Sequence, residues 1–468
     1  MPPVLALIFT LFLIAFLFYR DQKGRWTPSP ALVLPCLWLL LRGSRSVTEW
    51  LGLGPPPNGA EIVDGAPADR AVTFLLMGAG LIALLNRGIY WKKILSNNLA
   101  LWLFFFYCVL SVSWSDFPFV AFKRWFKLFG DPIMVLVVLT DRDPLKALDI
   151  VLRTMVNILV PLSVLLIKYY PHLGKGYDEW SGAAVYTGVT TNKNLLGFVL
   201  MICGLSLVWR VYKRWGAKPG NRLDDVVIPL CLLGMVGWLF SLADSKTSLI
   251  CFLIGTILFF VLGLSNIRRN LLTYFLLGVA AFIVLQSTMN LTGLIISSAG
   301  RDHTLTGRAE LWEAVLSMQQ HPLVGFGYES FWLGARRELL QERWYFAPNQ
   351  AHSGYIELYL NLGLVGWLFF GCVLLSCYVK LRRLLTLGSH QDDWVVFGRL
   401  GMSYLFIYLL YNYTEAAFKS PHLLFFIFLI FAIEYVPQRA AKRAAVPTIL
   451  RDSRGAQASR APTLYPAR

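Results

Sequence analysis

Long apolar runs constrain the fold of this chain more than any other feature of its sequence. A membrane-spanning helix needs roughly 20 mostly apolar residues, so runs of this kind predict membrane spans. We therefore expect an all-α polytopic membrane protein, a bundle of about 12–13 transmembrane helices. The runs fall at 3–19, 31–42, 71–85, 98–114, 128–140, 148–168, 195–210, 226–242, 247–264, 271–288, 354–379, 399–413 and 421–436.

The composition argues against a soluble enzyme. Hydrophobic residues make up 56% of the 468 residues and charged residues only 15%, whereas soluble domains carry roughly 25% charged residues. The net charge of +16 raises the alternative of a nucleic-acid partner, but the basic residues lie where topology and an anionic substrate explain them, so we expect no nucleic acid. The cysteines all lie in apolar runs without a C-x-x-C pair, so we expect neither disulfides nor a zinc site.

The loops between the runs differ in their basic residues. One alternating set of loops holds 25 Lys and Arg and the other set holds 14, and the richer set is predicted to be cytoplasmic. The C-terminal tail belongs to that set, so the N-terminus faces outward with thirteen spans and inward with twelve. We divide the chain into N-terminal spans (1–184), a core (185–436) that includes an outward loop (289–353), and a disordered basic tail (437–468).

The outward loop carries the best candidates for chemistry. We expect an amphipathic helix at Ala309–Gln320, with an apolar stripe that lies on the membrane surface; the stripe comprises Leu311, Trp312, Val315 and Leu316. The alternative is that the end of this helix places Arg308 above a cleft between spans. His352 lies at the end of the loop, next to Tyr355 and Glu357 at the start of a span.

Several other cations lie in outward segments, where the positive-inside rule disfavours them. Snorkelling to headgroups or pairing with nearby acids would explain each of them singly. Taken together they suggest binding of a phosphate-bearing lipid, because Arg offers phosphate a bidentate fork and Lys a compact point charge. The residues concerned are Lys123, Arg124, Lys127, Lys193 and Lys246.

Four ordered blocks of sequence resemble the O-antigen ligase/polymerase superfamily (Wzy/WaaL-like) and are most similar to ExoQ-type exopolysaccharide polymerases. Together they cover roughly residues 185–420. They are Thr191-Asn192-Lys193-Asn194; Ser245-Lys246-Thr247; Gly300-Arg301-Asp302 through Leu305-Thr306-Gly307-Arg308, Leu311-Trp312 and His321-Pro322-Leu323-Val324-Gly325-Phe326-Gly327-Tyr328; and Ala351-His352-Ser353-Gly354-Tyr355 followed by Leu362-Gly363-Leu364-Val365-Gly366.

The resemblance implies a glycosyltransferase at the periplasmic face of the bacterial inner membrane. It would polymerise undecaprenyl-diphosphate-linked oligosaccharide repeat units on an acceptor glycan, without metal or other cofactor, next to a flippase and a chain-length regulator. His352 would act as the general base or position the acceptor, and Arg308 and Lys246 would stabilise the leaving diphosphate. The same resemblance and the outward cations assign diphosphate or glycan binding to Lys193, Asn194, Arg301, Arg124 and Tyr355.

Two residues depart from the family pattern, and two other functions stay open. Ser353 follows the histidine where the family often has Asn, and Lys246 stands where ligases commonly have Arg. An O-antigen ligase, which transfers the finished glycan to lipid A–core or to protein, uses the same chemistry with another acceptor. A lipid-linked sugar transporter would need intramembrane acids for proton coupling, and Glu415 is the best candidate for one.

Overall fold

The helices follow the apolar runs. The computed structural model describes residues 1–21, 28–53, 66–177, 182–215, 226–271, 273, 303–344, 348–387, 392–418 and 422–435. Each predicted run that falls on these residues coincides with a helix, and the run at 271–288 lies almost wholly outside them. Helices are expected here because only an internally hydrogen-bonded backbone is stable in lipid.

The elements of the first half of the chain are α1 (Pro3–Asp21), η1 (Pro30–Leu32), α2 (Val33–Arg42), α3 (Val47–Leu51), α5 (Pro67–Leu85), α6 (Trp91–Asn97), α7 (Leu99–Leu110), η2 (Ser111–Trp114), α8 (Pro118–Leu128), α9 (Gly130–Leu139), α10 (Pro144–Tyr169), α11 (Pro171–Gly174), β1 (Lys175–Tyr177) and β2 (Ala184–Tyr186). Those of the second half are α12 (Lys193–Trp215), α13 (Ile228–Ala243), α14 (Lys246–Val261), α15 (Ser265–Arg269), α18 (His303–Ser317), α19 (Ala335–Arg343), α20 (Gly354–Leu387), α21 (Asp393–Thr414) and α22 (Leu423–Ala432). The strands β1 and β2 pair antiparallel and form a small hairpin that the sequence did not predict.

Among the described residues, six helices are long and apolar enough to cross a membrane: α1, α5, α10, α12, α20 and α21. The bent pair formed by α6 with α7–η2, at 86°, passes the same test as one unit. Shorter apolar helices are η1–α2, α13, α14 and α22. The chain is therefore an all-α, multi-pass membrane protein, as predicted.

Burial separates an inner group of helices from an outer one. The apolar windows of α12 and α21 are 78% buried inside the protein, and every residue of α22 is buried. Those of α1 and α5 are only 17% and 22% buried. An apolar surface that protein does not cover has to face lipid in a membrane protein. Hence α21 and α22 form the centre of the bundle, and α1 and α5 lie at its periphery.

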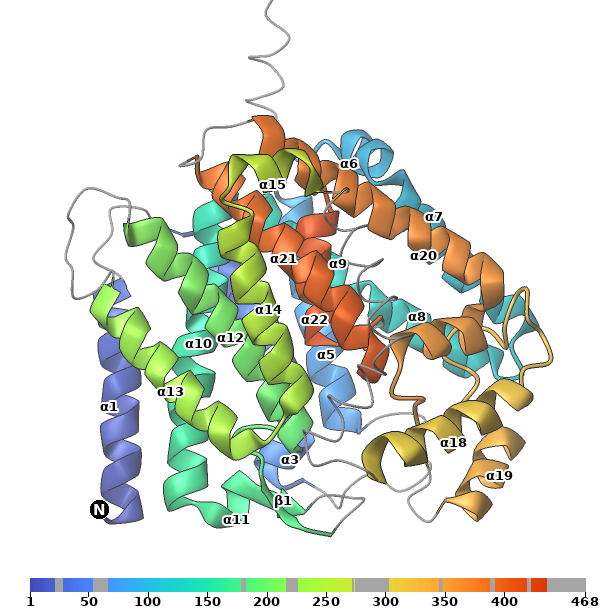
Figure 1. Cartoon of the computed structure of the whole chain (residues 1–468), viewed down its shortest axis with the longest axis horizontal. Coiled ribbons are helices and arrows are strands. Elements are labelled where there is room, and N and C mark those ends of the chain that lie inside the picture. The colour runs from blue at the N-terminus through green and yellow to red at the C-terminus, as the bar shows by residue number, and fades with distance from the viewer. Residues whose placement is uncertain are drawn as a thin grey trace, which may run out of the picture.

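The ends of the helices gather at two opposite faces (Figure 1). One face, termed the site face below, carries the start of α1, α3, α11, the hairpin, α18 and α19; the other carries α6 and α15. At the site face, the Pro3 carbonyl accepts a hydrogen bond from the Tyr170 hydroxyl at 3.1 Å. At the other face, the Glu434 backbone N–H donates to Asn98 at 2.8 Å. Pro3 and Glu434 therefore lie at opposite faces of the bundle.

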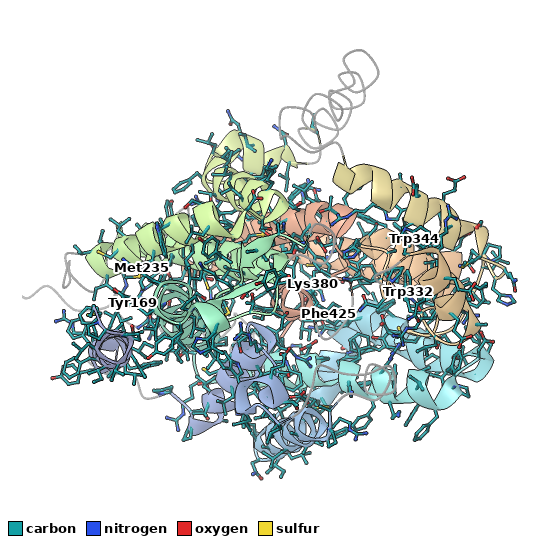
Figure 2. All side chains as sticks on the ribbon, turned by 90° about the horizontal axis from the view of Figure 1, so that it is seen from below. Tyr169, Met235, Trp332, Trp344, Lys380 and Phe425 are labelled. Atoms are coloured by element: carbon teal, nitrogen blue, oxygen red, sulfur yellow. The ribbon has the colours of Figure 1, made fainter. Side chains whose placement is uncertain are left out.

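Helix α18 corrects the prediction for the loop. It spans His303–Ser317, so it begins and ends earlier than the expected Ala309–Gln320. Its Leu311 and Val315 are fully buried, whereas Leu316 is 43% exposed and does not belong to the buried stripe. The buried side chains of α18 join Trp332 and Trp344 in a small core of their own (Figure 2). The apolar stripe therefore packs within the protein and not on the membrane surface.

The turn at 322–327 packs on a break in α20. Gly363 has φ 63° and ψ −164°, which interrupts the helix. A Cβ there would lie 2.4 Å from the backbone of Leu323, and a Cβ on Gly325 would lie 2.4 Å from the backbone of Asn361. The Leu364 N–H donates to the Pro322 carbonyl at 2.9 Å. Glycine is needed at both positions, because both the conformation and the backbone contact exclude a side chain. Two of the four sequence blocks thus contact each other directly.

Candidate active site

His352 lies on a short strap that enters α20 at the site face. Its φ of 49° is in the left-handed region, which is uncommon for a residue with a side chain. The strap is fixed on both sides of the histidine. The Ala351 carbonyl accepts from Trp312 Nε1 at 2.7 Å, and the Gly354 N–H donates to the Glu415 carbonyl at 3.0 Å. Backbone strain of this kind persists only where surrounding contacts enforce it, and it clusters at functional sites.

The buried carboxylate of Glu357 binds the backbone of the strap next to His352. It is 4% exposed and accepts hydrogen bonds from the Ala351 N–H at 2.6 Å and from Trp332 Nε1 at 2.9 and 3.0 Å. Asn361 Nδ2 donates to the same carboxylate at 3.3 Å. Glu357 therefore connects the first turn of α20 to the core below α18, and it fixes the backbone next to His352.

Arg308 reaches the same place from α18. Its Nη1 donates to the Thr414 carbonyl at 2.6 Å, and its Nη2 lies 3.3 Å from Glu415 Oε1. We expected Arg308 at the N-terminal end of this helix. Because α18 begins at His303, Arg308 instead lies within the helix. The alternative, that the end of this helix places Arg308 above a cleft between spans, stays a prediction; the contacts place Arg308 at the end of α21.

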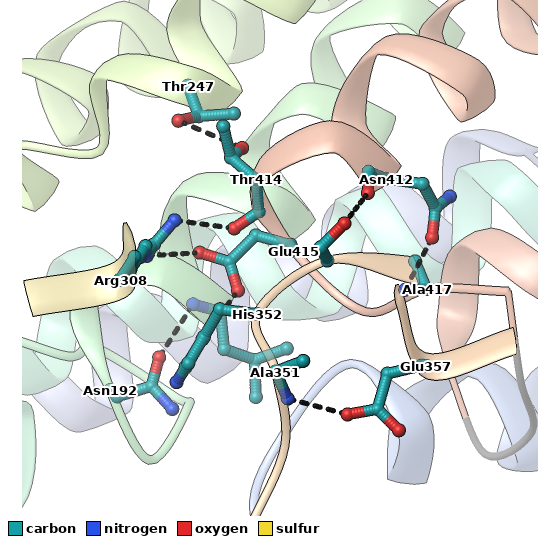
Figure 3. Close-up of polar contacts among 12 residues, drawn as sticks. Asn192, Thr247, Arg308, Ala351, His352, Glu357, Asn412, Thr414, Glu415 and Ala417 are labelled. Carbon is teal, nitrogen blue, oxygen red and sulfur yellow. Dashed lines mark hydrogen bonds and ion pairs between the residues drawn. The ribbon is translucent and has the colours of Figure 1, made fainter. Parts of the chain in front are cut away.

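Glu415 joins the two predicted residues. It is the C-cap of α21, and its Oε2 lies 3.4 Å from His352 Nδ1 while its Oε1 faces Arg308 (Figure 3). Burial opposes ionisation of this carboxyl, but the hydrogen bond and charge of His352 and the charges of Arg308 and His422 outweigh burial and lower its pKa below the ordinary value. Glu415 is therefore an ionised acceptor shared by a histidine and an arginine, each of which is about one-fifth exposed.

The two earlier sequence blocks begin helices beside this cluster. Lys193 and Asn194 are the first residues of α12, and Lys246 is the first residue of α14. A Cβ on Gly197 of α12 would lie 2.3 Å from Ser245 Cβ, so the starts of these two helices touch. Next to Lys246, the Thr247 hydroxyl lies 3.5 Å from the Thr414 hydroxyl. The structure therefore gathers Lys246, Arg308 and His352 around the end of α21, with Lys193 and Asn194 beside them.

Two of the remaining predicted residues, Tyr355 and Arg124, make contacts outside this cluster. The Tyr355 hydroxyl donates to the Leu409 carbonyl at 2.8 Å, and its ring stacks on Trp367 with centroids 5.4 Å apart. These contacts make Tyr355 a packing residue between α20 and α21. Arg124 lies on α8 and donates to the Glu329 carbonyl. Arg301 lies outside the described residues.

The sequence interpretation missed two members of the site. It assigned Glu415 to proton coupling in a transporter, and it did not consider His422, whose charge acts on Glu415 and whose ring lies 4.5 Å from Phe198. An acid at the end of an apolar run was the signal for Glu415, but only the fold shows that Arg308 and His352 come to it from other segments. Among the described residues, no group of three or more His, Cys, Asp or Glu is placed to hold a metal ion.

Comparison with known proteins shows which family this chain resembles. A profile described as O-antigen ligase matches residues 230–371, a stretch that contains Lys246, Arg308 and His352. The chain is also 26% identical over 339 residues to the exopolysaccharide production protein ExoQ of Rhizobium meliloti (strain 1021). The aligned stretch covers 66% of this chain and 72% of that protein. The resemblance inferred from the four blocks is thus confirmed, and it supports a polymerase or ligase role in polysaccharide synthesis.

Proposed function

We propose that the protein is an inner-membrane glycosyltransferase that polymerises undecaprenyl-diphosphate-linked oligosaccharides at the periplasmic face. The observation that carries this proposal is the meeting of Arg308 and His352 on Glu415 at the end of α21. Transfer of a glycan from a diphosphate needs a cation for the leaving group and a base for the acceptor hydroxyl. The site provides the cation, Arg308, and the base, His352, and both contact the carboxylate of Glu415.

Glycan transfer proceeds here as a single displacement. The acceptor hydroxyl oxygen bonds to the anomeric carbon of the donor glycan, the bond from that carbon to the diphosphate oxygen breaks, and the configuration is inverted. The released polyprenyl diphosphate carries the electron pair of the broken bond. Arg308 and Lys246 stabilise this charge, and Lys246 does so from the N-terminal end of α14, where backbone N–H groups also favour an anion.

His352 accepts the proton of the attacking hydroxyl. Since an ionised carboxylate only accepts hydrogen bonds, the hydrogen between His352 and Glu415 belongs to Nδ1, and Nε2 of the neutral ring has a free lone pair. The distance of 3.4 Å is long for a hydrogen bond, and catalytic hydrogen bonds commonly shorten when substrate binds. Glu415 then stabilises the imidazolium that forms.

The contacts of Glu415 favour this reaction over the transporter alternative. A proton-coupling acid has to take up and release a proton during transport. Glu415 instead faces Arg308 and His352 and has a lowered pKa, which keeps it ionised. By the count of basic residues, we place the site face in the periplasm and the C-terminus in the cytoplasm. A flippase that delivers the lipid-linked substrate and a chain-length regulator are the partners this function requires.

Products formed by the purified protein test the proposal. The full chain in nanodiscs is incubated with undecaprenyl-diphosphate-linked repeat units, and products are separated by size. A ladder that is lost in His352→Gly and Arg308→Ala, and kept in the matched control His172→Ala on α11, supports the polymerase. Transfer only after addition of lipid A–core identifies a ligase. Intact substrate without any product, in protein shown to be folded, refutes glycan transfer and favours transport.

A further inference from the structure

A polar pocket lies at the face of α6, on the opposite side of the bundle from the candidate active site. The cavity has a volume of about 460 Å³, which falls within the range of small-molecule sites. Its polar lining comes from the segment before η1, the segment between α5 and α6, and the segment directly after α9: Ser29, Arg87, Thr140, Asp141 and Arg142. None of these residues belongs to the candidate active site, so the pocket is a separate feature of the fold.

Arg87 holds the three segments of the pocket together. Its Nη1 donates to the Val137 carbonyl and to the Thr140 hydroxyl, both at 2.6 Å, and its Nη2 donates to Ser29 Oγ at 3.2 Å. The same Nη2 lies 3.3 Å from Asp141 Oδ2, and the two side chains of this ion pair are 18% and 0% exposed. The charge of Asp141 is therefore balanced within the wall of the pocket, and Arg87 acts as a structural clamp.

Arg142 supplies the charge that the wall does not balance. Its backbone N–H donates to Asp141 Oδ1 at 2.7 Å, which fixes the residue at the pocket. Its guanidinium is exposed and forms no ion pair with a described residue. The next acid along the chain, Asp143, is already paired with Lys146 at 3.0 Å. The pocket therefore offers one positive charge, and an arginine presents a bidentate fork to an oxyanion such as phosphate.

The walls of the pocket continue into apolar surface that protein does not cover. Directly after η1, α2 exposes Val33 and Leu37, and directly before Arg87, α5 exposes Ile82 and Leu85. The spacings of four and three residues place each pair on one side of its helix. The helices α2, α5 and α9 contact one another, and the apolar window of α5 is only 22% buried. Because such a surface faces lipid, the pocket lies where headgroups meet acyl chains.

We propose that this pocket binds the headgroup phosphate of an anionic phospholipid of the cytoplasmic leaflet, the side on which the count of basic residues places this face. The Arg142 guanidinium binds the phosphate, and the acyl chains cover the apolar sides of α2 and α5. A phosphodiester carries one negative charge, which matches the one unbalanced cation, and basic pockets between helices at the cytoplasmic side are typical sites for anionic headgroups. A soluble phosphate compound offers the same anion but leaves the apolar walls uncovered, so the occupant is a lipid. The site does not depend on glycan transfer.

Binding of phosphatidylglycerol to the full chain tests this site without relying on activity. The purified protein is titrated with phosphatidylglycerol in an excess of phosphatidylcholine, and bound lipid is counted by native mass spectrometry. We expect the wild type to bind phosphatidylglycerol in preference to phosphatidylcholine, and Arg142→Gln to bind it about tenfold more weakly. Arg142→Lys keeps the charge but not the fork, so its loss is smaller. The matched control is Arg383→Gln, which removes an exposed arginine of α20 at the same face and outside the pocket, and it binds as the wild type does.

Four results would overturn the lipid site. Equal binding of the two lipids by the wild type shows that the pocket does not select an anion, and unchanged affinity in Arg142→Gln shows that Arg142 does not hold it. An equal loss in Arg142→Gln and Arg383→Gln shows a response to the charge of the whole face. Equal competition by soluble glycerol 3-phosphate shows that the acyl chains contribute nothing. Because both arginines are exposed, the melting temperature without phosphatidylglycerol is expected to stay at the wild-type value and is the control for folding.

Discussion

Two polar clusters at opposite faces use similar residues for different purposes. At the face of α6, Lys380 Nζ donates to Asn98 Oδ1 at 2.8 Å and to the Ala432 carbonyl at 3.0 Å (Lys380 is labelled in Figure 2). The same Asn98 accepts from the Glu434 N–H and donates to the Glu434 carbonyl. These contacts satisfy backbone groups where α22 ends, so this cluster fastens helix ends to one another.

At the site face, the charged side chains meet one another. Arg308, Glu415 and His352 form a cation–carboxylate–imidazole group, and the histidine is held in an uncommon backbone conformation. The imidazole keeps one nitrogen for substrate, and the arginine keeps further N–H donors. The comparison teaches that capping contacts indicate a structural role, whereas facing titratable groups with spare capacity indicate chemistry. The predictions below test this distinction.

Replacement of His352 by glycine gives the largest expected effect. Glycine accepts a φ of 49° without strain, so the fold is kept or slightly stabilised while the base is removed. We expect glycan transfer to fall by about 100-fold or more, measured as the initial rate of ladder formation. The melting temperature in detergent is the control for folding. A variant with near wild-type rate would show that the site-face cluster is structural.

Arg308 should show a graded loss. Arg308→Ala removes a donor to the leaving diphosphate and is expected to lower the rate by about 100-fold. Arg308→Lys keeps the charge but not the fork, so we expect about a tenfold loss. The two rates are compared at saturating substrate. Equal rates for the lysine variant and the wild type would mean that the fork to Thr414 and Glu415 contributes nothing.

Glu415→Gln should have a moderate effect with a defined pH dependence. The neutral amide cannot stabilise the imidazolium of His352, and we expect about a tenfold lower rate. Because the pKa of Glu415 is lowered in the folded protein, its stabilising contribution is present above the ordinary value of 4.5 and is lost as pH falls through the lowered folded value. The difference in Tm between wild type and variant should therefore shrink below pH 4.5. A constant difference down to full protonation contradicts an ionised Glu415.

Lys380→Met is expected to change stability and not chemistry. It removes the side-chain donor to the Ala432 carbonyl and one of the two donors to Asn98 Oδ1, which costs about 1–3 kcal/mol of folding free energy. The rate per folded molecule should stay within about twofold of wild type. Thermal unfolding measures the first quantity and the ladder assay the second. Loss of activity in fully folded Lys380→Met protein would contradict a purely structural role for the cluster at Lys380.

The sequence predicted the helical bundle and named residues that the fold brings together at the end of α21. Apolar runs located the helices because lipid leaves the backbone no other partner, and the four blocks identified His352, Arg308 and Lys246. The predicted boundaries of α18 were wrong because the helix includes residues before Ala309 that show no apolar stripe. The burial of α18 depends on Trp332 and other residues that are distant in sequence. The role of Glu415 was missed because its partners lie 63 and 107 residues away in sequence.

One measurement tests the central claim most directly: the release of free undecaprenyl diphosphate counted against new glycosidic bonds in the purified protein, with the anomeric configuration of each bond read by NMR. The account predicts one diphosphate released per bond, an inverted anomeric centre, and loss of both products in His352→Gly. Retained configuration, or bond formation that continues in the His352→Gly variant, would contradict a single displacement at the Arg308–Glu415–His352 site.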